Sequence, residues 1–175
     1  MILHNPPFPA ALAGPNRIGR SWHQWLNHAM EIWTDLVYKS YCFVHKNAND
    51  QAITAGAEAL LTWTTAAYDT QSEVDLTNEK WTCKKAGVYY VYCRAAFAVG
   101  ADGDRLYLNI YKSNTKIAEF RTTAGGGGDE SLESIALLYL EVDDYITFKV
   151  ENTDNNDTIR GAVVDTFFTI YRLGW

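Results

Sequence analysis

Proline and cysteine are scarce in this 175-residue sequence, and long apolar runs are missing. The four prolines, at positions 6, 7, 9 and 15, all lie near the start, so the rest of the chain is free to form regular secondary structure. Cys42, Cys83 and Cys93 are odd in number and irregularly spaced, which fits neither a disulfide framework nor a zinc site. We therefore expect three free thiols that pack as small core hydrophobes.

The apolar segments are too short for a membrane span, which needs about 20 residues. The first residues, MILHNPPFPA, lack the basic start and apolar stretch of a signal peptide, so we expect folding in a cytoplasm and no membrane insertion. Positive charge is also scarce: the net charge is −6 and the longest basic run is the pair Lys84–Lys85. A nucleic-acid partner is therefore not expected.

Catalytic motifs are missing as well. The sequence contains no G-x-S-x-G, H-E-x-x-H or phosphate-binding loop, and His23 and His28 are five residues apart rather than the four of a helical metal pair. Gly125–Gly128 resembles a phosphate cradle, but no lysine and no helical pattern follow it. We predict a protein that is not an enzyme and that needs no cofactor.

The segment 1–39 is predicted to be an extended arm followed by one short amphipathic helix. The prolines keep residues 1–20 extended, and Ser21 to Gln24 has the form of a capping box that would start a helix. Apolar residues then recur at helical spacing. A helix this short needs something to pack against, so large apolar side chains on it are expected to anchor the chain to a partner. The predicted anchoring residues are Trp22, Trp25, Trp33 and Leu36.

From residue 40 to residue 175 the period of the apolar pattern is two, interrupted by turn sequences such as NAND, KSNT and NTDNND. This pattern predicts an all-β head domain, a ten-stranded sandwich or jelly roll. The expected strands are 40–46, 58–64, 73–76, 80–83, 87–99, 105–111, 116–122, 133–140, 144–151 and 162–173.

Tyrosines alternate with core residues in two of these strands. In 87–99 the residues from Tyr89 to Val99 at odd positions are apolar and are predicted to face the core, while Tyr90 and Tyr92 face outward. In 105–111 the same alternation turns Tyr107 and Tyr111 outward. Tyrosine is enriched where subunits meet, so these four tyrosines are predicted to lie at an interface between subunits.

Several motifs resemble those of the globular-head domain of complement component 1q, a branch of the trimeric jelly rolls that includes tumour necrosis factor. The family pattern F-T-C-P followed by G-x-Y-x-F is similar to Trp81–Lys84 followed by Gly87–Val91, and the closing T-F-x-G-F-L-L strand is similar to Thr166–Leu173. A leucine-rich strand followed by G-D-x-V resembles Leu138–Ile146, with Asp143 in the position of the family glycine. The resemblance implies a ten-stranded jelly roll that assembles as a homotrimer.

A short arm and helix that lead into a trimeric β head resemble the layout of tailed-bacteriophage fibre and capsid-decoration proteins. We therefore expect a virion structural protein, assembled in the host cytoplasm, that binds other virion proteins through residues 1–39 and serves as a fibre, decoration or host-attachment protein. The alternative is a cellular lectin-like jelly-roll module that binds a carbohydrate or a protein.

Two kinds of loop carry further possibilities. Carboxylates in the acidic loops are ligands of the type that calcium takes, although Asp, Asn and Gly are also common in tight β connections. The calcium candidates are Asp102, Asp104, Asp154 and Asp157. The glycine-rich loop 124–131 is expected to be exposed, and a host surface glycan is a candidate ligand for it.

Overall fold

The computed structural model describes residues 24–27, 29–30, 39–47, 49–99, 101–126 and 128–174. Residues 24–27 and 29–30 are helical, as the capping box and the apolar spacing predicted for this segment. The arm and the remaining part of the expected helix lie outside the described residues. Lys39–Trp175 is one compact unit by its internal contacts.

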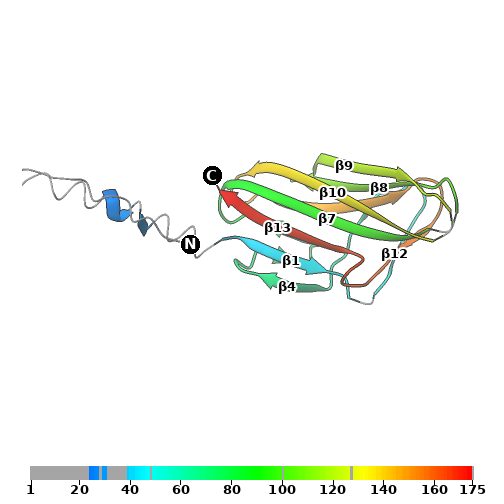
Figure 1. The fold of residues 1–175 in the computed structure, drawn as a ribbon, viewed down its shortest axis with the longest axis horizontal. Helices are drawn as coiled ribbons and strands as arrows, with labels where there is room; N and C mark the ends of the chain where they lie inside the picture. Colours follow the sequence, from blue (N-terminus) through cyan, green and yellow to red (C-terminus); the bar gives the residue numbers. More distant parts are fainter. Residues whose placement is uncertain are drawn as a thin grey trace, which may run out of the picture. The chain divides into compact units, whose positions relative to one another are not determined.

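Two antiparallel sheets form this unit (Figure 1). The larger sheet has the order β2-β12-β7-β13-β1-β4, with β10 also paired to β7. Its strands are β1 (Tyr41–His45), β2 (Gln51–Ile53), β4 (Thr65–Asp69), β7 (Gly87–Val99), β10 (Gly128–Leu140), β12 (Asp157–Ile159) and β13 (Phe167–Gly174).

The smaller sheet has the order β5-β6-β11-β8-β9, with β3 also paired to β11. Its strands are β3 (Ala59–Leu60), β5 (Val74–Asp75), β6 (Lys80–Thr82), β8 (Arg105–Lys112), β9 (Thr115–Thr123) and β11 (Tyr145–Asn152).

The all-β jelly-roll prediction is confirmed, but the strands number thirteen among the described residues rather than ten. The additional strands β2, β4 and β12 are short, and their sequences are rich in Ala, Thr and Asp, which read as connections. They form because the sheet offers backbone partners: β2 pairs with β12, and β4 pairs with β1. The strand expected at 133–140 begins earlier, at Gly128, because Asp129 and Glu130 pair with Ala98 and Phe97 of β7.

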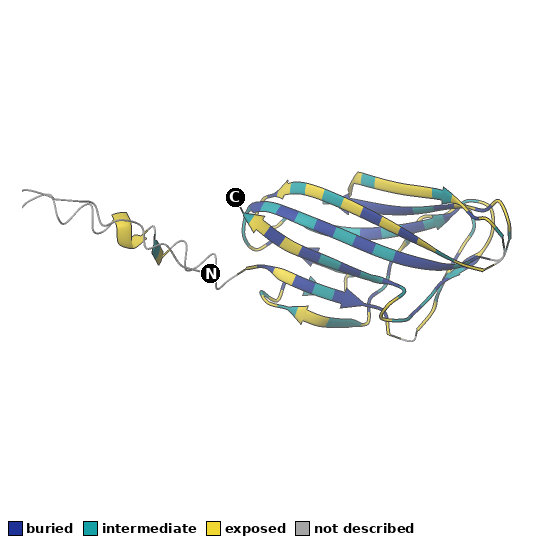
Figure 2. Ribbon diagram, viewed as in Figure 1, coloured by how far each residue is buried: buried dark blue, intermediate teal, exposed yellow. Residues whose placement is uncertain are grey.

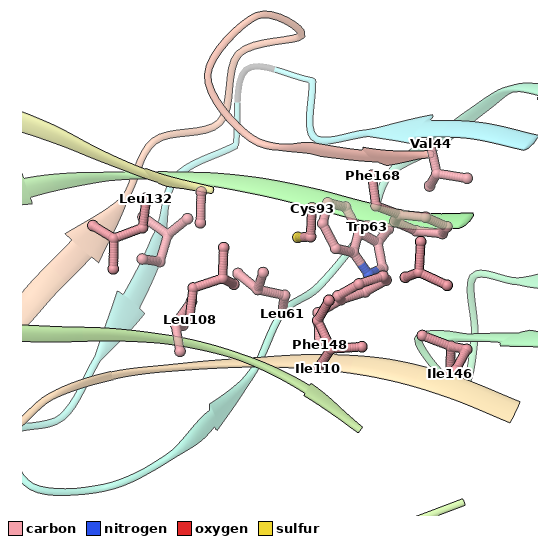
Figure 3. Close-up of a cluster of buried hydrophobic side chains, with 14 of the residues drawn as sticks. Val44, Leu61, Trp63, Cys93, Leu108, Ile110, Leu132, Ile146, Phe148 and Phe168 are labelled. Carbon is pink, nitrogen blue, oxygen red and sulfur yellow. The ribbon is translucent and has the colours of Figure 1, made fainter. Parts of the chain in front are cut away.

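The core lies between the two sheets (Figure 3). Along β7 every odd-numbered residue from Tyr89 to Val99 is buried, as the alternation predicted, and Figure 2 shows this alternation along the strand. Cys42, Cys83 and Cys93 are free and buried, as expected. Burial raises the pKa of the Cys42 and Cys93 thiols, so neither is a nucleophile at neutral pH.

The turn between β10 and β11 has a strained backbone. Asp143 has a φ of 72°, in the left-handed region that favours glycine. The turn is fixed by main-chain hydrogen bonds from Asp143 N to Cys83 O (2.8 Å) and from Cys83 N to Asp144 O (2.8 Å). The Asp144 carboxylate also accepts from Glu141 N at 2.8 Å.

Candidate functional site

Aromatic rings cover the outer face of the larger sheet. Tyr90 and Tyr92 of β7 lie there, opposite Tyr171 and Thr169 of β13 in the strand register. The Tyr90 and Tyr171 rings are 5.0 Å apart, and the Tyr92 and Phe167 rings are 5.6 Å apart. The row continues onto β1 and β4 through the pairs Phe43–Phe167 (5.4 Å) and Tyr41–Tyr68 (6.1 Å).

β10 extends this surface to the edge of the sheet. Ile135, Leu137 and Tyr139 lie opposite Tyr92, Tyr90 and Val88, so they share the outer face with the tyrosines. All three are more than half exposed, and Leu137 is 64% exposed. We call the following residues the aromatic face: Tyr41, Phe43, Tyr68, Tyr90, Tyr92, Ile135, Leu137, Tyr139, Phe167, Tyr171 and Leu173.

A groove of about 510 Å³ adjoins the aromatic face where the sandwich is open between β9 and β10. Phe120 of β9 pairs with the core residue Leu108 and yet remains 45% exposed, because no strand closes this side of the sandwich. The residues that line the groove are Ala118, Glu119, Phe120, Ser131, Glu133, Ser134 and Ile135. A large contiguous apolar surface such as the aromatic face marks an interaction site, since soluble monomers seldom expose one.

The outer face of the smaller sheet is different in character. Here Lys149, Asn109 and Glu119 form one row across β11, β8 and β9, and Glu151, Tyr107 and Arg121 form the next. Alternating charges of this kind are typical of a solvated face. Tyr107 and Tyr111 therefore lie on the opposite side of the sandwich from Tyr90 and Tyr92, and the four predicted tyrosines do not form one surface.

Glu58 holds Tyr111 in place on this charged face. The Tyr111 hydroxyl donates to both carboxylate oxygens of Glu58, at 2.6 and 2.7 Å, and Asn109 Nδ2 donates to the same group at 2.8 Å. Burial alone would raise the pKa of Glu58, but the Tyr111 hydrogen bond and the nearby Lys149 lower it below its usual value. The Lys149 ammonium also lies 4.2 Å from the centre of the Tyr111 ring. The hydroxyl and the ring of Tyr111 therefore both make contacts within its own chain.

The acidic loops that suggested calcium have partners of their own. The Asp154 carboxylate pairs with the Arg105 guanidinium at 2.9 Å, and hydrogen bonds from Arg105 lower its pKa. Asp104 accepts from Asn152 Nδ2 (2.9 Å) and from Asn155 Nδ2 (2.6 Å), while Asp157 Oδ1 accepts from Thr158 N (2.7 Å).

Within the described ranges, no three His, Cys, Asp or Glu side chains are grouped so that they could hold a metal ion. Asp102, the fourth calcium candidate, is exposed.

Of the four predicted anchoring residues, Trp25 is among the described residues. Trp25 lies in the helical residues 24–27 and is exposed, as are Leu26 and Met30. Trp22, Trp33 and Leu36 lie outside the described residues. Among the helices that the structure describes, none has the length and apolar character needed to cross a membrane.

Sequence reasoning missed the contribution of β10 to the aromatic face. The signal was present: residues 135–140, IALLYL, are apolar on both faces of the strand, whereas a strand with one solvated face alternates with polar residues. The sequence pattern predicted a strand at 133–140, but neither of its faces was assigned from it. The aromatic face therefore combines the predicted Tyr90 and Tyr92 with residues that were not assigned to an interface from the sequence.

Comparison with known proteins gives a family and a fold. The C1q domain family profile matches residues 42–171. The structure is similar to Eiger TNF from S. frugiperda, with a TM-score of 0.60 and 17% identity over 78% of this chain and 93% of that chain. It is also similar to murine APRIL at pH 5.0, with a TM-score of 0.62 and 13% identity over 77% of this chain and 99% of that one.

The globular domain of the zebrafish complement 1qA protein gives a TM-score of 0.55 and 18% identity, over 77% of this chain and 98% of that chain. Among curated proteins, none matches the sequence. At these identities the structural similarities establish the fold, and the family rests on the sequence profile.

Proposed function

The chain belongs to the C1q domain family, and from this membership we propose that it forms a homotrimer whose head, residues 40–175, binds a partner rather than catalysing a reaction. Domains of this type are binding modules. The observation that carries the proposal is the aromatic face, which continues into an open groove between β9 and β10. A monomer would leave these rings and aliphatic side chains in water.

The geometry of the surface favours a cyclic assembly. The aromatic face lies on the outer side of the larger sheet and the groove opens between β9 and β10, so the two are adjoining but different parts of one protomer's surface, with Ile135 at their boundary. Contact between different surfaces is heterologous, and such contacts close into a ring when the rotation allows it. Tyr90 and Tyr92 are retained as interface residues in this proposal, together with Leu137 and Phe120.

The test is the mass of the purified protein in solution. Size-exclusion chromatography with light scattering should give three times the chain mass of 19.7 kDa. A mass equal to one chain across the micromolar range would contradict the homotrimer and would leave the aromatic face available to a different protein.

We further propose that the trimer is a structural protein of a bacteriophage virion, as a fibre, decoration or host-attachment head. The support is the layout of the chain, in which a proline-rich segment and a helix with exposed Trp25 precede the head. In this proposal residues 1–39 bind other virion proteins, and the predicted anchors are Trp22, Trp25, Trp33 and Leu36. The protein is then assembled in the host cytoplasm and resides in the virion.

The alternative is a cellular lectin-like module with the same trimeric head. Proteomic analysis of purified virions, with the neighbouring genes of the locus as an independent check, distinguishes the two. Detection of the chain in particles at a fixed ratio to capsid protein supports the virion role, and its detection only in uninfected cells supports the alternative. Under either role we propose a host glycan as the ligand of the glycine-rich segment 124–131, whose residues from Gly128 onward belong to β10, and removal of Gly125–Gly128 with no loss of binding would exclude it.

A further inference from the structure

A lysine is buried at the end of β1, outside the aromatic face. Lys46 is 1% exposed, although lysine is seldom fully buried without a partner of opposite charge. Within the described part of the chain, no carboxylate lies in ion-pairing contact with its amine, and Glu79 and Asp50 act on it only at longer range. Burial lowers the pKa of Lys46, so a larger share of the amine is neutral and nucleophilic than for an exposed lysine.

The side chain of Gln51, the first residue of β2, lies next to this amine. Its carbonyl oxygen Oε1 is 3.4 Å from Lys46 Nζ. The same oxygen accepts from the main-chain N of Thr62 at 3.0 Å and from the Thr62 hydroxyl at 3.0 Å. Donors aimed at a carbonyl oxygen stabilise the negative charge that develops there when a nucleophile attacks the carbon.

Thr62 also bridges the two groups. Its hydroxyl Oγ1 is 2.7 Å from Lys46 Nζ, and its main-chain oxygen is 2.9 Å from the same atom. The hydroxyl therefore accepts from the amine while it donates to the amide oxygen Oε1, which is the arrangement of a proton relay from the amine to that oxygen. The leaving group is held as well, since Gln51 Nε2 donates to Leu60 O at 2.7 Å.

From this geometry we propose that Lys46 and Gln51 form an intramolecular isopeptide bond. The neutral Nζ attacks Cδ of Gln51, an Nζ–Cδ bond forms and the Cδ–Nε2 bond breaks. One proton passes from Nζ through the Thr62 hydroxyl to Oε1 of the tetrahedral adduct and then, as the adduct collapses, to Nε2, which leaves as ammonia. No oxidant or cofactor is needed, and the product amide is neutral, so the buried amine no longer has a charge to lose or gain. The bond ties β2, a three-residue edge strand, to the end of β1.

The intact mass of the denatured full-length protein tests this directly. The bond lowers the mass by about 17 Da, the mass of the ammonia lost in such a substitution. Trypsin then gives one linked peptide covering residues 40–80, because Lys46 is no longer a cleavage site. The full sequence mass, with separate peptides 40–46 and 47–80, would show that Lys46 is only a buried amine and would overturn the proposal.

Variants locate the mass loss. Lys46→Arg keeps hydrogen-bond donors and Gln51→Glu keeps the side-chain length, and each should restore the full mass, apart from the substitution itself. Lys84→Arg is the matched control, since Lys84 Nζ contacts the main-chain oxygen of Gln71 at 2.7 Å and has no side-chain amide to attack. It should retain the deficit. A deficit that persists in Lys46→Arg lies elsewhere in the chain and contradicts the proposal, whatever the stability of the variant.

Discussion

Asp143 adopts a backbone conformation that favours glycine. The hydrogen bonds that fix this turn are made by the main chain and by the Asp144 carboxylate. We predict that Asp143→Gly raises the free energy of unfolding by about 0.5–1 kcal/mol, because the strain exceeds the added flexibility of the unfolded chain. Urea unfolding measures the change. Gly103→Ala is the converse control, with φ of 88° and open space around the added methyl, and it should be destabilised by a similar amount. A less stable Asp143→Gly protein would mean that the carboxylate makes a stronger contact than the turn suggests.

Glu73 is a buried carboxyl whose ionisation weakens the fold. It accepts hydrogen bonds from Ser40 Oγ and Lys84 N, but burial outweighs them and raises its pKa above the usual value of 4.5. The protonated Glu73 carboxyl therefore stabilises the folded state. This stabilisation is complete below about pH 4.5, the range in which an unfolded glutamate titrates, and it is lost as the pH rises through the higher pKa of the folded state. We predict that Glu73→Gln is more stable than the parent at neutral pH and that the difference disappears near pH 4.

Thermal unfolding from pH 4 to pH 8 checks this prediction. Asp154→Asn is a control of opposite sign, because the hydrogen bonds from Arg105 lower the pKa of Asp154. Its contribution is present above the unfolded pKa and is lost as the pH falls, so the variant should be less stable than the parent at neutral pH. Parallel pH profiles for Glu73→Gln and the parent would contradict the account of Glu73.

Among the elements, β10 is the one on which the homotrimer proposal depends most. Leu137 is 64% exposed in one chain, so Leu137→Glu should change the stability of an isolated protomer little. A buried interface contact of this size contributes about 2 kcal/mol, and an unpaired carboxylate adds a desolvation cost at each of three contacts. We predict that the variant has the mass of one chain at micromolar concentration by light scattering.

The matched control is Val142→Glu, in the turn after β10, where the side chain is also more than half exposed but lies off the aromatic face. It should remain trimeric. A trimeric Leu137→Glu protein would place the subunit contact on another surface, and Tyr107→Ser then tests whether the charged face contributes.

Alternation of apolar residues predicted the long strands well and the short ones poorly. In β7 and β8 apolar core residues alternate with other residues over most of the strand, so both faces could be assigned from the sequence. β2 and β12 have three residues each, and their pairing depends on backbone groups offered by distant segments. The sequence of a three-residue strand does not indicate which distant strand it pairs with. For the same reason Tyr90 and Tyr107 were both predicted to lie at an interface. Alternation within a strand indicates which side chains face outward, but it does not indicate which of the two sheets the strand joins.

At the scale of the whole molecule, the division between residues 1–39 and 40–175 predicts that the head folds and assembles without the preceding segment. We expect a chain that lacks residues 1–39 to remain a folded trimer, because the aromatic face and the groove lie entirely in the head. Circular dichroism and light scattering on the truncated chain check the fold and the mass. In the virion proposal the same chain no longer joins particles, which a pull-down with purified virions measures. Aggregation or a monomeric mass would show that the segment belongs to the head or to its subunit contacts.

The family and the fold were accessible from the sequence, since the motifs around Cys83, Gly87 and Phe167 are local. The binding surface was only partly accessible. Its residues come from β1, β4, β7, β10 and β13, and their juxtaposition is a property of the strand order. The Lys46 cluster was missed for a related reason, because Thr62 and Gln51 meet the amine only after the chain has folded back between β2 and β3.

The register of β1 and β13 has a mechanical consequence. Tyr41 at the start of β1 lies opposite Tyr171 near the end of β13, so the chain enters and leaves at the same end of the sheet. A force that pulls these two ends apart loads their hydrogen bonds one after another, and the pair unzips. A force between this end and the loop after Val99, at the far end of β7, instead loads many hydrogen bonds together in shear. The head should therefore resist tension along its strands far better than tension between its own termini.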